Sequence, residues 1–131
     1  EFALADYNGK IVSSSDFKGK PLVLNSWAAW CPFCLDELPD FVTIKKEFGE
    51  EVNIMAINRR ESLKTAKGFT DGLGISNDLI FLIDKKDSFY RSIGGFAMPE
   101  TLFIDKEGNI VEPYRGKLSE SQFRKKVKNL L

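Results

Sequence analysis

The residues best suited to chemistry are Cys31 and Cys34, the two cysteines of a 131-residue chain. An apolar run at 22–24 precedes them and apolar side chains at helical spacing follow, so we expect the pair where a buried strand ends and a helix begins. The first turn of a helix has unsatisfied N–H groups and the positive end of the helix dipole, and both favour a thiolate. Because a thiolate is the species that attacks disulfides, the spacing predicts a redox-active pair.

Three other interpretations of the cysteine pair are open. A structural disulfide would close a very short loop and would add little stability. A zinc site needs two further ligands, and since the chain has no other Cys and no His, carboxylates or a second subunit would have to supply them. Two free cysteines without a role would leave their position at a helix start unexplained. Redox chemistry is the hypothesis that accounts for that position.

The composition predicts one domain with a substantial core. Apolar residues make up 43% of the chain, with eleven Phe, and aromatic-rich periodic segments are usually buried. Lys plus Arg and Asp plus Glu number 19 each, so charge gives no reason to expect nucleic acid or an anionic membrane as a partner. No apolar run has the length of a membrane span and no signal peptide opens the chain. The first residue is Glu1 rather than Met, which leaves room for a signal or anchor that has been removed.

Strand and helix patterns alternate along the chain. They predict a hairpin around Tyr7-Asn8-Gly9, then strand 22–26, helix 32–48 ending at Gly49, strand 52–58, helix 62–71 ended by Gly72 and Gly74, strand 79–83, helix 85–93, hairpin strands 101–105 and 109–114, and helix 119–131. This order predicts an α/β fold with a mixed central sheet, helices on both faces and an antiparallel end.

Three further residues could support chemistry at the cysteines. Glu37 shares a helix face with apolar side chains, so it is expected to point inward, although a solvated helix acid has the same pattern. Asn25 lies in the apolar central strand and needs a hydrogen-bond partner there. Pro99 follows Met98 immediately before a strand, where a cis bond would hold a tight local geometry; an ordinary trans loop proline is the alternative.

Four segments in order resemble the thioredoxin superfamily, and within it the extracytoplasmic thiol–disulfide oxidoreductases of the TlpA/ResA type. They are Phe2-x-Leu-x-Asp6 to Pro21, which looks like the N-terminal extension; Leu24-Asn25-x-Trp27-Ala28-x-Trp30-Cys31-x-x-Cys34-x-x-Glu37-x-Pro39, the active-site segment; residues 59–83, a central αβ insertion; and Met98-Pro99-Glu100-Thr101-x-Phe103-Ile104-Asp105, the cis-proline strand. The resemblance implies a thioredoxin fold in a single domain, 1–131, with residues 1–20 as an N-terminal β-hairpin extension and 59–83 as the insertion.

The resemblance also implies a role for individual residues. Cys31 would be the exposed nucleophile and Cys34 the buried resolving thiol. Pro99 would be a cis proline facing Cys31. Glu37 takes the acidic position near the active-site helix, and Asn25 takes the strand position where cytoplasmic thioredoxins have a buried Asp. These last three would support the catalytic pair.

The implied reaction is dithiol–disulfide exchange with a protein substrate, without cofactor or metal. An apolar rim would bind the substrate backbone, formed by Trp30, Pro32, Phe33 and Met98. We expect reduction of disulfides in exported proteins, with cytochrome c maturation as one setting, in an extracytoplasmic monomer that a membrane-embedded thiol donor re-reduces. Since the Pro32-Phe33 dipeptide resembles that of glutaredoxins, a disulfide oxidase or isomerase is an alternative; a thioredoxin-like binding module with an idle disulfide is another.

Overall fold

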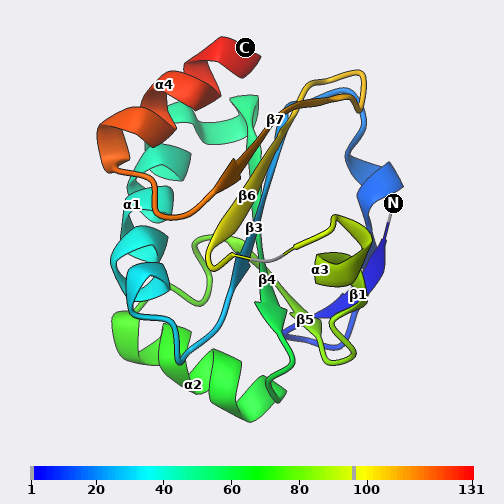
Figure 1. Ribbon diagram of the computed structural model, residues 1–131, viewed down its shortest axis with the longest axis vertical. Coiled ribbons are helices and arrows are strands. Elements are labelled where there is room, and N and C mark those ends of the chain that lie inside the picture. Colours follow the sequence, from blue (N-terminus) through cyan, green and yellow to red (C-terminus); the bar gives the residue numbers. More distant parts are fainter. Residues whose placement is uncertain (1, 96) are drawn as a thin grey trace.

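Seven strands form one mixed sheet in the computed structural model, which describes residues 2–95 and 97–131 (Figure 1). The elements are β1 Ala3–Asp6, β2 Ile11–Ser13, η1 Ser14–Phe17, β3 Leu22–Trp27, α1 Pro32–Phe48, η2 Gly49–Glu51, β4 Asn53–Arg59, α2 Leu63–Leu73, β5 Ile80–Asp84, α3 Ser88–Ser92, β6 Glu100–Ile104, β7 Ile110–Arg115 and α4 Glu120–Leu130. The predicted order of strands and helices is confirmed.

The strand order across the sheet is β2-β1-β5-β4-β3-β6-β7. β3, β4 and β5 run parallel, whereas β1 and β2 at one edge and β6 and β7 at the other pair antiparallel. β3 is buried along its whole length, as expected for a central strand that is covered on both faces. The mixed α/β sheet predicted from the sequence is therefore confirmed.

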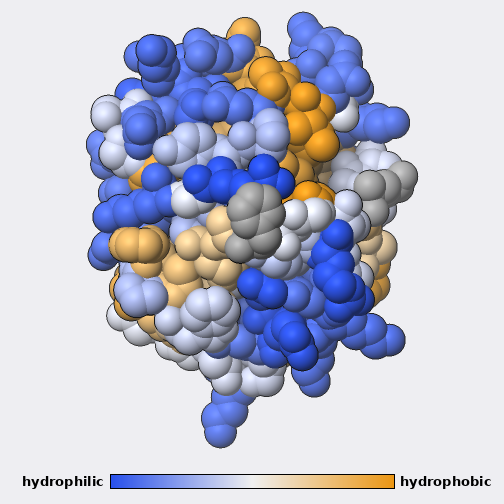
Figure 2. Space-filling view, in the orientation of Figure 1, coloured by the Kyte–Doolittle hydropathy of each residue, from blue (hydrophilic) through white to orange (hydrophobic). Residues whose placement is uncertain are grey.

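Helices cover the two faces of the sheet unequally. α1 and α4 pack together on one face, while α3 lies on the other face near the N-terminal hairpin (Figure 1). The first face holds a large apolar cluster in which the rings of Phe41 and Phe123 stack at 4.2 Å between centroids. The second face holds a smaller cluster around Leu22, Leu24 and Leu102. Polar residues cover most of the molecular surface in the view of Figure 2.

Local sequence signals set the ends of two helices. α1 starts at Pro32, which has no N–H to leave unsatisfied in the first turn, and ends before Gly49, whose φ of 55° lies in the left-handed region. α4 begins with a capping box, in which Ser119 and Gln122 exchange hydrogen bonds between side chain and backbone. The bounds of α1 agree with the prediction.

Two predicted helices have different ends. α2 continues through Gly72 and stops at Gly74, which takes the left-handed C-cap conformation. The helix expected over 85–93 is reduced to Ser88–Ser92. The Asp84 carboxylate accepts hydrogen bonds from the N–H groups of Ser88 and Phe89. These are the first-turn N–H groups that have no partner within the helix, so the helix starts at Ser88. The preceding residues form a turn instead of helix.

Candidate active site

The sheet register brings two distant segments together beside the cysteines. β3 leads directly into the cysteine loop, and β6 pairs antiparallel with β3, with Asn25 opposite Thr101 and Ser26 opposite Glu100. The residues just before β6 therefore lie next to the residues just after β3. The Met98–Pro99 peptide bond there is cis, as predicted. Met98 packs against the apolar cluster that contains both cysteines.

Cys31 occupies the N-cap position of α1, and both cysteines are free thiols. The Cys31 Sγ accepts a hydrogen bond from the backbone N–H of Cys34 at 3.3 Å. Such donors at a helix start stabilise negative charge on sulfur. Burial raises the pKa of the Cys34 thiol well above its ordinary value, and its hydrogen bond with Cys31 adds to the effect, while a backbone hydrogen bond from Ala28 opposes it. The two thiols are thus in different environments.

The expectation of an exposed Cys31 is wrong for this structure. Cys31 is 3% exposed and Cys34 is 1% exposed, so the two differ little in access to water. The reason is local: the Cys31 N–H donates to the Ala28 carbonyl at 3.1 Å in a tight turn, and Cys31 belongs to the apolar cluster against which Met98 packs. The Cys31 sulfur then faces the first turn of α1.

Glu37 lies inside the protein, as the inward-facing interpretation predicted. Its side chain is 1% exposed, and its carboxylate accepts hydrogen bonds from the Leu118 N–H at 2.7 Å and from the Asn25 amide at 3.2 Å. Burial raises its pKa from 4.5 to about 7, and these two hydrogen bonds hold the rise back. Its charge is also felt at Cys34, where it helps to raise the thiol pKa. Glu37 can therefore exchange a proton near neutral pH.

Asn25 links this carboxylate to the neighbouring strand. Its Nδ2 donates to Glu37 and also to the Thr101 hydroxyl, at 3.2 Å each. Its Oδ1 has no hydrogen-bond partner within the described parts of the chain. Thr101 and the Leu118 amide were not predicted as site residues. Strand alternation would place Thr101 beside Asn25 once the register is known, but nothing in the sequence marks a backbone amide so far along the chain.

The predicted rim residues divide into an exposed and a covered group. Trp30 is 63% exposed and Phe33 is 55% exposed, and Pro32 between the cysteines is also exposed. Met98 is half-buried and Pro99 is buried. Trp30 and Phe33 thus present apolar surface directly beside the cysteine pair.

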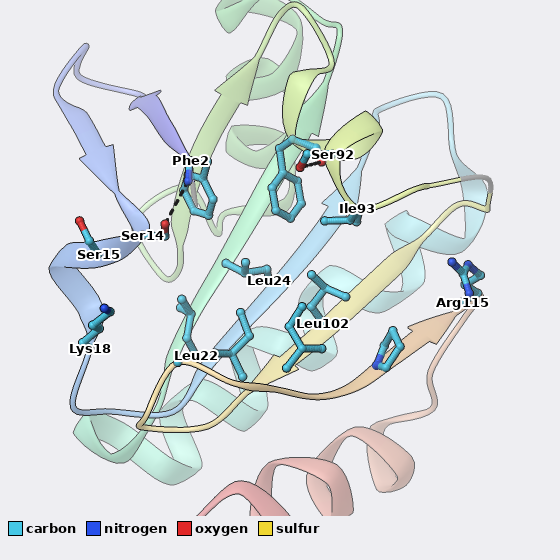
Figure 3. Close-up of a pocket in the computed structure, with 15 residues that line it drawn as sticks. Phe2, Ser14, Ser15, Lys18, Leu22, Leu24, Ser92, Ile93, Leu102 and Arg115 are labelled. Atoms are coloured by element: carbon cyan, nitrogen blue, oxygen red, sulfur yellow. Dashed lines mark hydrogen bonds between the residues drawn. The ribbon is translucent and has the colours of Figure 1, made fainter.

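A separate cavity of about 560 Å³ lies on the opposite face of the sheet (Figure 3). Its floor is formed by Leu22, Leu24 and Leu102, with Ile93 of the α3 end on one side. None of the described residues that line it belongs to the predicted site. Within residues 2–95 and 97–131, no group of three or more His, Cys, Asp or Glu could hold a metal ion. No helix in the same ranges is long and apolar enough to cross a membrane.

A Cys-x-x-Cys pair where a buried strand of an α/β sheet turns into a helix is typical of thioredoxin-like redox proteins, and the fold and site place the chain in that class. The Redoxin family profile matches residues 1–131. The thiol–disulfide oxidoreductase ResA of Bacillus thuringiensis subsp. konkukian is 30% identical over 132 residues, covering 98% of this chain and 74% of that relative.

Solved thioredoxin-like structures superpose on nearly the whole chain. A structure of MTB DsbF in mixed oxidized and reduced forms has a TM-score of 0.92 and 25% identity, covering 99% of this chain and 95% of that one. The pneumococcal exposed lipoprotein thioredoxin Etrx1 of Streptococcus pneumoniae has a TM-score of 0.83 and 30% identity, covering 98% of both chains. The chain belongs to the Redoxin family, and it is a thiol–disulfide oxidoreductase with a thioredoxin fold.

Proposed function

We propose that this oxidoreductase reduces disulfides of exported proteins through a Cys31–Cys34 dithiol cycle. The observation that carries the direction is the burial of both thiols at 3% and 1% exposure, which raises the pKa of Cys34. A strongly oxidising pair owes its high potential to a reduced form that is stabilised. Burial of both thiols disfavours the thiolate and so does not stabilise the reduced form, which favours a reducing pair instead.

The cycle has two exchange steps. The Cys31 thiolate attacks a substrate disulfide, forming a bond between Cys31 and the substrate while the other substrate sulfur leaves as a thiolate and takes up a proton. Cys34 then loses its proton and attacks the Cys31 sulfur, which forms the Cys31–Cys34 disulfide and releases the second substrate thiol. Glu37 is proposed as the acceptor of the Cys34 proton, because it is buried, its charge acts on the Cys34 thiol, and burial raises its pKa to about 7.

The remaining roles concern binding and positioning. Trp30, Pro32, Phe33 and Met98 would cover the apolar part of a substrate, with Pro99 beside them at the start of β6. Asn25 would hold Glu37 in place. The whole chain is proposed as one domain, with residues 1–20 as its N-terminal extension and 59–83 as its central insertion, since strands from both regions belong to the single sheet.

The setting of the reaction is also a proposal. A similar chain is described as an exposed lipoprotein thioredoxin, which supports an extracytoplasmic location. There the oxidised pair would need a membrane-embedded thiol donor for its reduction, and the protein is proposed to act as a monomer without nucleic acid. Disulfides of exported proteins, apocytochrome c among them, are the proposed substrates.

The direction of the reaction is tested by the reduction potential of the Cys31–Cys34 pair, measured by equilibration with thiol buffers, together with reduction of insulin disulfides. A potential near that of thioredoxin, about −270 mV, is expected; a value near that of DsbA, about −120 mV, would make the protein an oxidase. Cys34→Ser should trap a mixed disulfide with a protein substrate and Cys31→Ser should not. A protein that neither reduces insulin nor forms this mixed disulfide would be a binding module.

A further inference from the structure

An acidic side chain from the end of β4 holds the loop that carries the cysteines. β3 and β4 run side by side and parallel, with Trp27 opposite Asn58, so the carboxyl ends of both strands lie next to each other (Figure 1). Just after these strand ends, the Glu61 Oε1 accepts a hydrogen bond from the Ala29 N–H at 2.8 Å. Ala29 lies in the loop between β3 and the helix start. The contact thus joins this loop to the turn that precedes α2.

Glu61 is itself fixed by its neighbours. The amide of Asn58, which is 0% exposed, donates to the same Oε1 at 2.8 Å and accepts from the Glu61 N–H at 3.2 Å. Between them, Arg60 adopts a left-handed conformation with φ of 62° and donates its N–H to the Asp84 carbonyl at 3.0 Å. A non-glycine residue in this region costs backbone energy, so the surrounding contacts must maintain it. The carboxylate is therefore held in place before any substrate arrives.

The loop held by Glu61 touches both cysteines. The Ala28 carbonyl accepts from the Cys31 N–H at 3.1 Å, and the Ala28 backbone hydrogen-bonds the Cys34 sulfur, which favours its thiolate. Ala29, whose N–H is bound by Glu61, is the next residue along the chain. Any shift of Ala29 would displace the Ala28 carbonyl from the Cys31 N–H and the Ala28 backbone from the Cys34 sulfur.

We propose that Glu61 is a positioning residue for the second exchange step, acting through the backbone of residues 28 and 29. In that step Cys34 gives up its proton, its thiolate bonds to the Cys31 sulfur, and the bond from Cys31 to the substrate breaks as the substrate leaves as a thiolate. Glu61 keeps the Ala28 backbone at the Cys34 sulfur, where negative charge forms. The proposal rests on the dithiol cycle proposed above and assigns a further residue to it.

The two steps can be followed separately in a single turnover. A reduced protein is mixed with a disulfide-linked peptide, quenched with acid at successive times, and analysed by mass spectrometry for free protein, mixed disulfide and oxidised protein. For Glu61→Ala we expect the mixed disulfide to accumulate because its resolution slows about tenfold, the effect of roughly one lost hydrogen bond. Formation of the mixed disulfide should change less than about twofold, since Cys31 keeps its helix-start donor.

Two further variants and a measurement on the Ala29 amide distinguish a positioning role of Glu61 from an effect of its charge and from a general loss of folding. Glu61→Gln keeps an oxygen that can accept from the Ala29 N–H, so it should restore the rate; Glu51→Ala removes an exposed acid and should match the parent protein. Loss of charge alone would favour the Cys34 thiolate and would speed the second step. Hydrogen exchange of the Ala29 amide should accelerate in Glu61→Ala.

The outcomes distinguish this proposal from the cycle on which it rests. Equal slowing of both steps, no slowing, or slowing that Glu61→Gln fails to restore would each overturn the positioning role. If the parent protein forms neither the mixed disulfide nor oxidised protein, the dithiol cycle itself fails. Accumulation of the mixed disulfide in Glu61→Ala, with an exchange-labile Ala29 amide and rescue by Gln, would support the role.

Discussion

Replacing the buried acid at position 37 by a neutral residue should remove a loss of stability that the parent protein undergoes as the pH rises. The Glu37 carboxyl is 1% exposed, and burial raises its pKa from 4.5 to about 7. A raised acid pKa means that the folded state binds the proton more tightly than the unfolded chain. The stabilisation is complete below pH about 4.5, is lost progressively as the pH rises to about 7, and is absent above that.

The size of this loss follows from the two pKa values. A difference of about 2.5 pH units corresponds to about 3 kcal/mol of unfolding free energy. Glu37→Gln stays neutral at every pH, and its side-chain oxygen can still accept from the Leu118 N–H. The variant should therefore lack this loss, and its unfolding free energy relative to the parent protein should rise by about 3 kcal/mol between pH 4.5 and pH 8.

Urea unfolding of the reduced proteins at a series of pH values from 4.5 to 8.5 measures this difference directly. Comparing the variant with the parent cancels the titration of all other groups. Glu51→Gln makes the same chemical change at an exposed position and serves as the control. If the stability curves of Glu37→Gln and the parent stay parallel over this range, burial does not raise the pKa of Glu37. Glu37 would then not be a proton acceptor that titrates near neutral pH. A matching pH dependence of the second exchange step, flattened in Glu37→Gln, would connect the same titration to catalysis.

Three other substitutions test the segments around the site. Gly95→Ala would place a Cβ about 2.5 Å from the Tyr90 ring, so we expect a loss of about 1–3 kcal/mol in thermal unfolding; an unchanged melting temperature would refute the close approach. Tyr90→Phe removes a 2.6 Å hydrogen bond to the Ala97 carbonyl, beside Met98; it should cost about 1 kcal/mol and raise KM for a protein disulfide, while alkylation of the thiols stays the same. Ser119→Ala removes the cap of α4 and should lower the urea midpoint by the equivalent of about 1 kcal/mol, with no change in exchange rate.

The sequence was most informative where a structural feature depends on local chemistry. The start of α1 at Pro32 and its end before Gly49 follow from backbone groups in the adjacent residues, and the capping box of α4 is contained in four consecutive residues. The position of the cysteine pair at a strand–helix junction is likewise local. Such features need no knowledge of what lies across the sheet, so they were predicted with correct bounds.

The features that failed or were missed depend on distant parts of the chain or on loop conformation. Glu37 was predicted to point inward, but its partner at Leu118 lies 81 residues away. The burial of Cys31 depends on the turn between Ala28 and Cys31 and on the distant residues of the apolar cluster that contains it. The Glu61 carboxylate accepts from the Ala29 N–H, 32 residues earlier, and nothing in the residues around Glu61 indicates that partner. In each case the sequence gives the residue type, but only the structure gives the groups that it contacts.

The identity of residue 25 can be understood from the two protonation states of Glu37. As a carboxylate, Glu37 accepts from the Asn25 Nδ2, and the Asn25 Oδ1 then has no partner among the described residues. As a neutral acid, Glu37 must donate its own proton, and an amide can turn over to present an oxygen in place of a nitrogen. An Asp at position 25 would offer only acceptors and, when ionised, a second negative charge beside a buried acid, which would raise the pKa of Glu37 further. An amide serves both states of Glu37 without adding charge, which is what a proton acceptor for Cys34 needs from its neighbour.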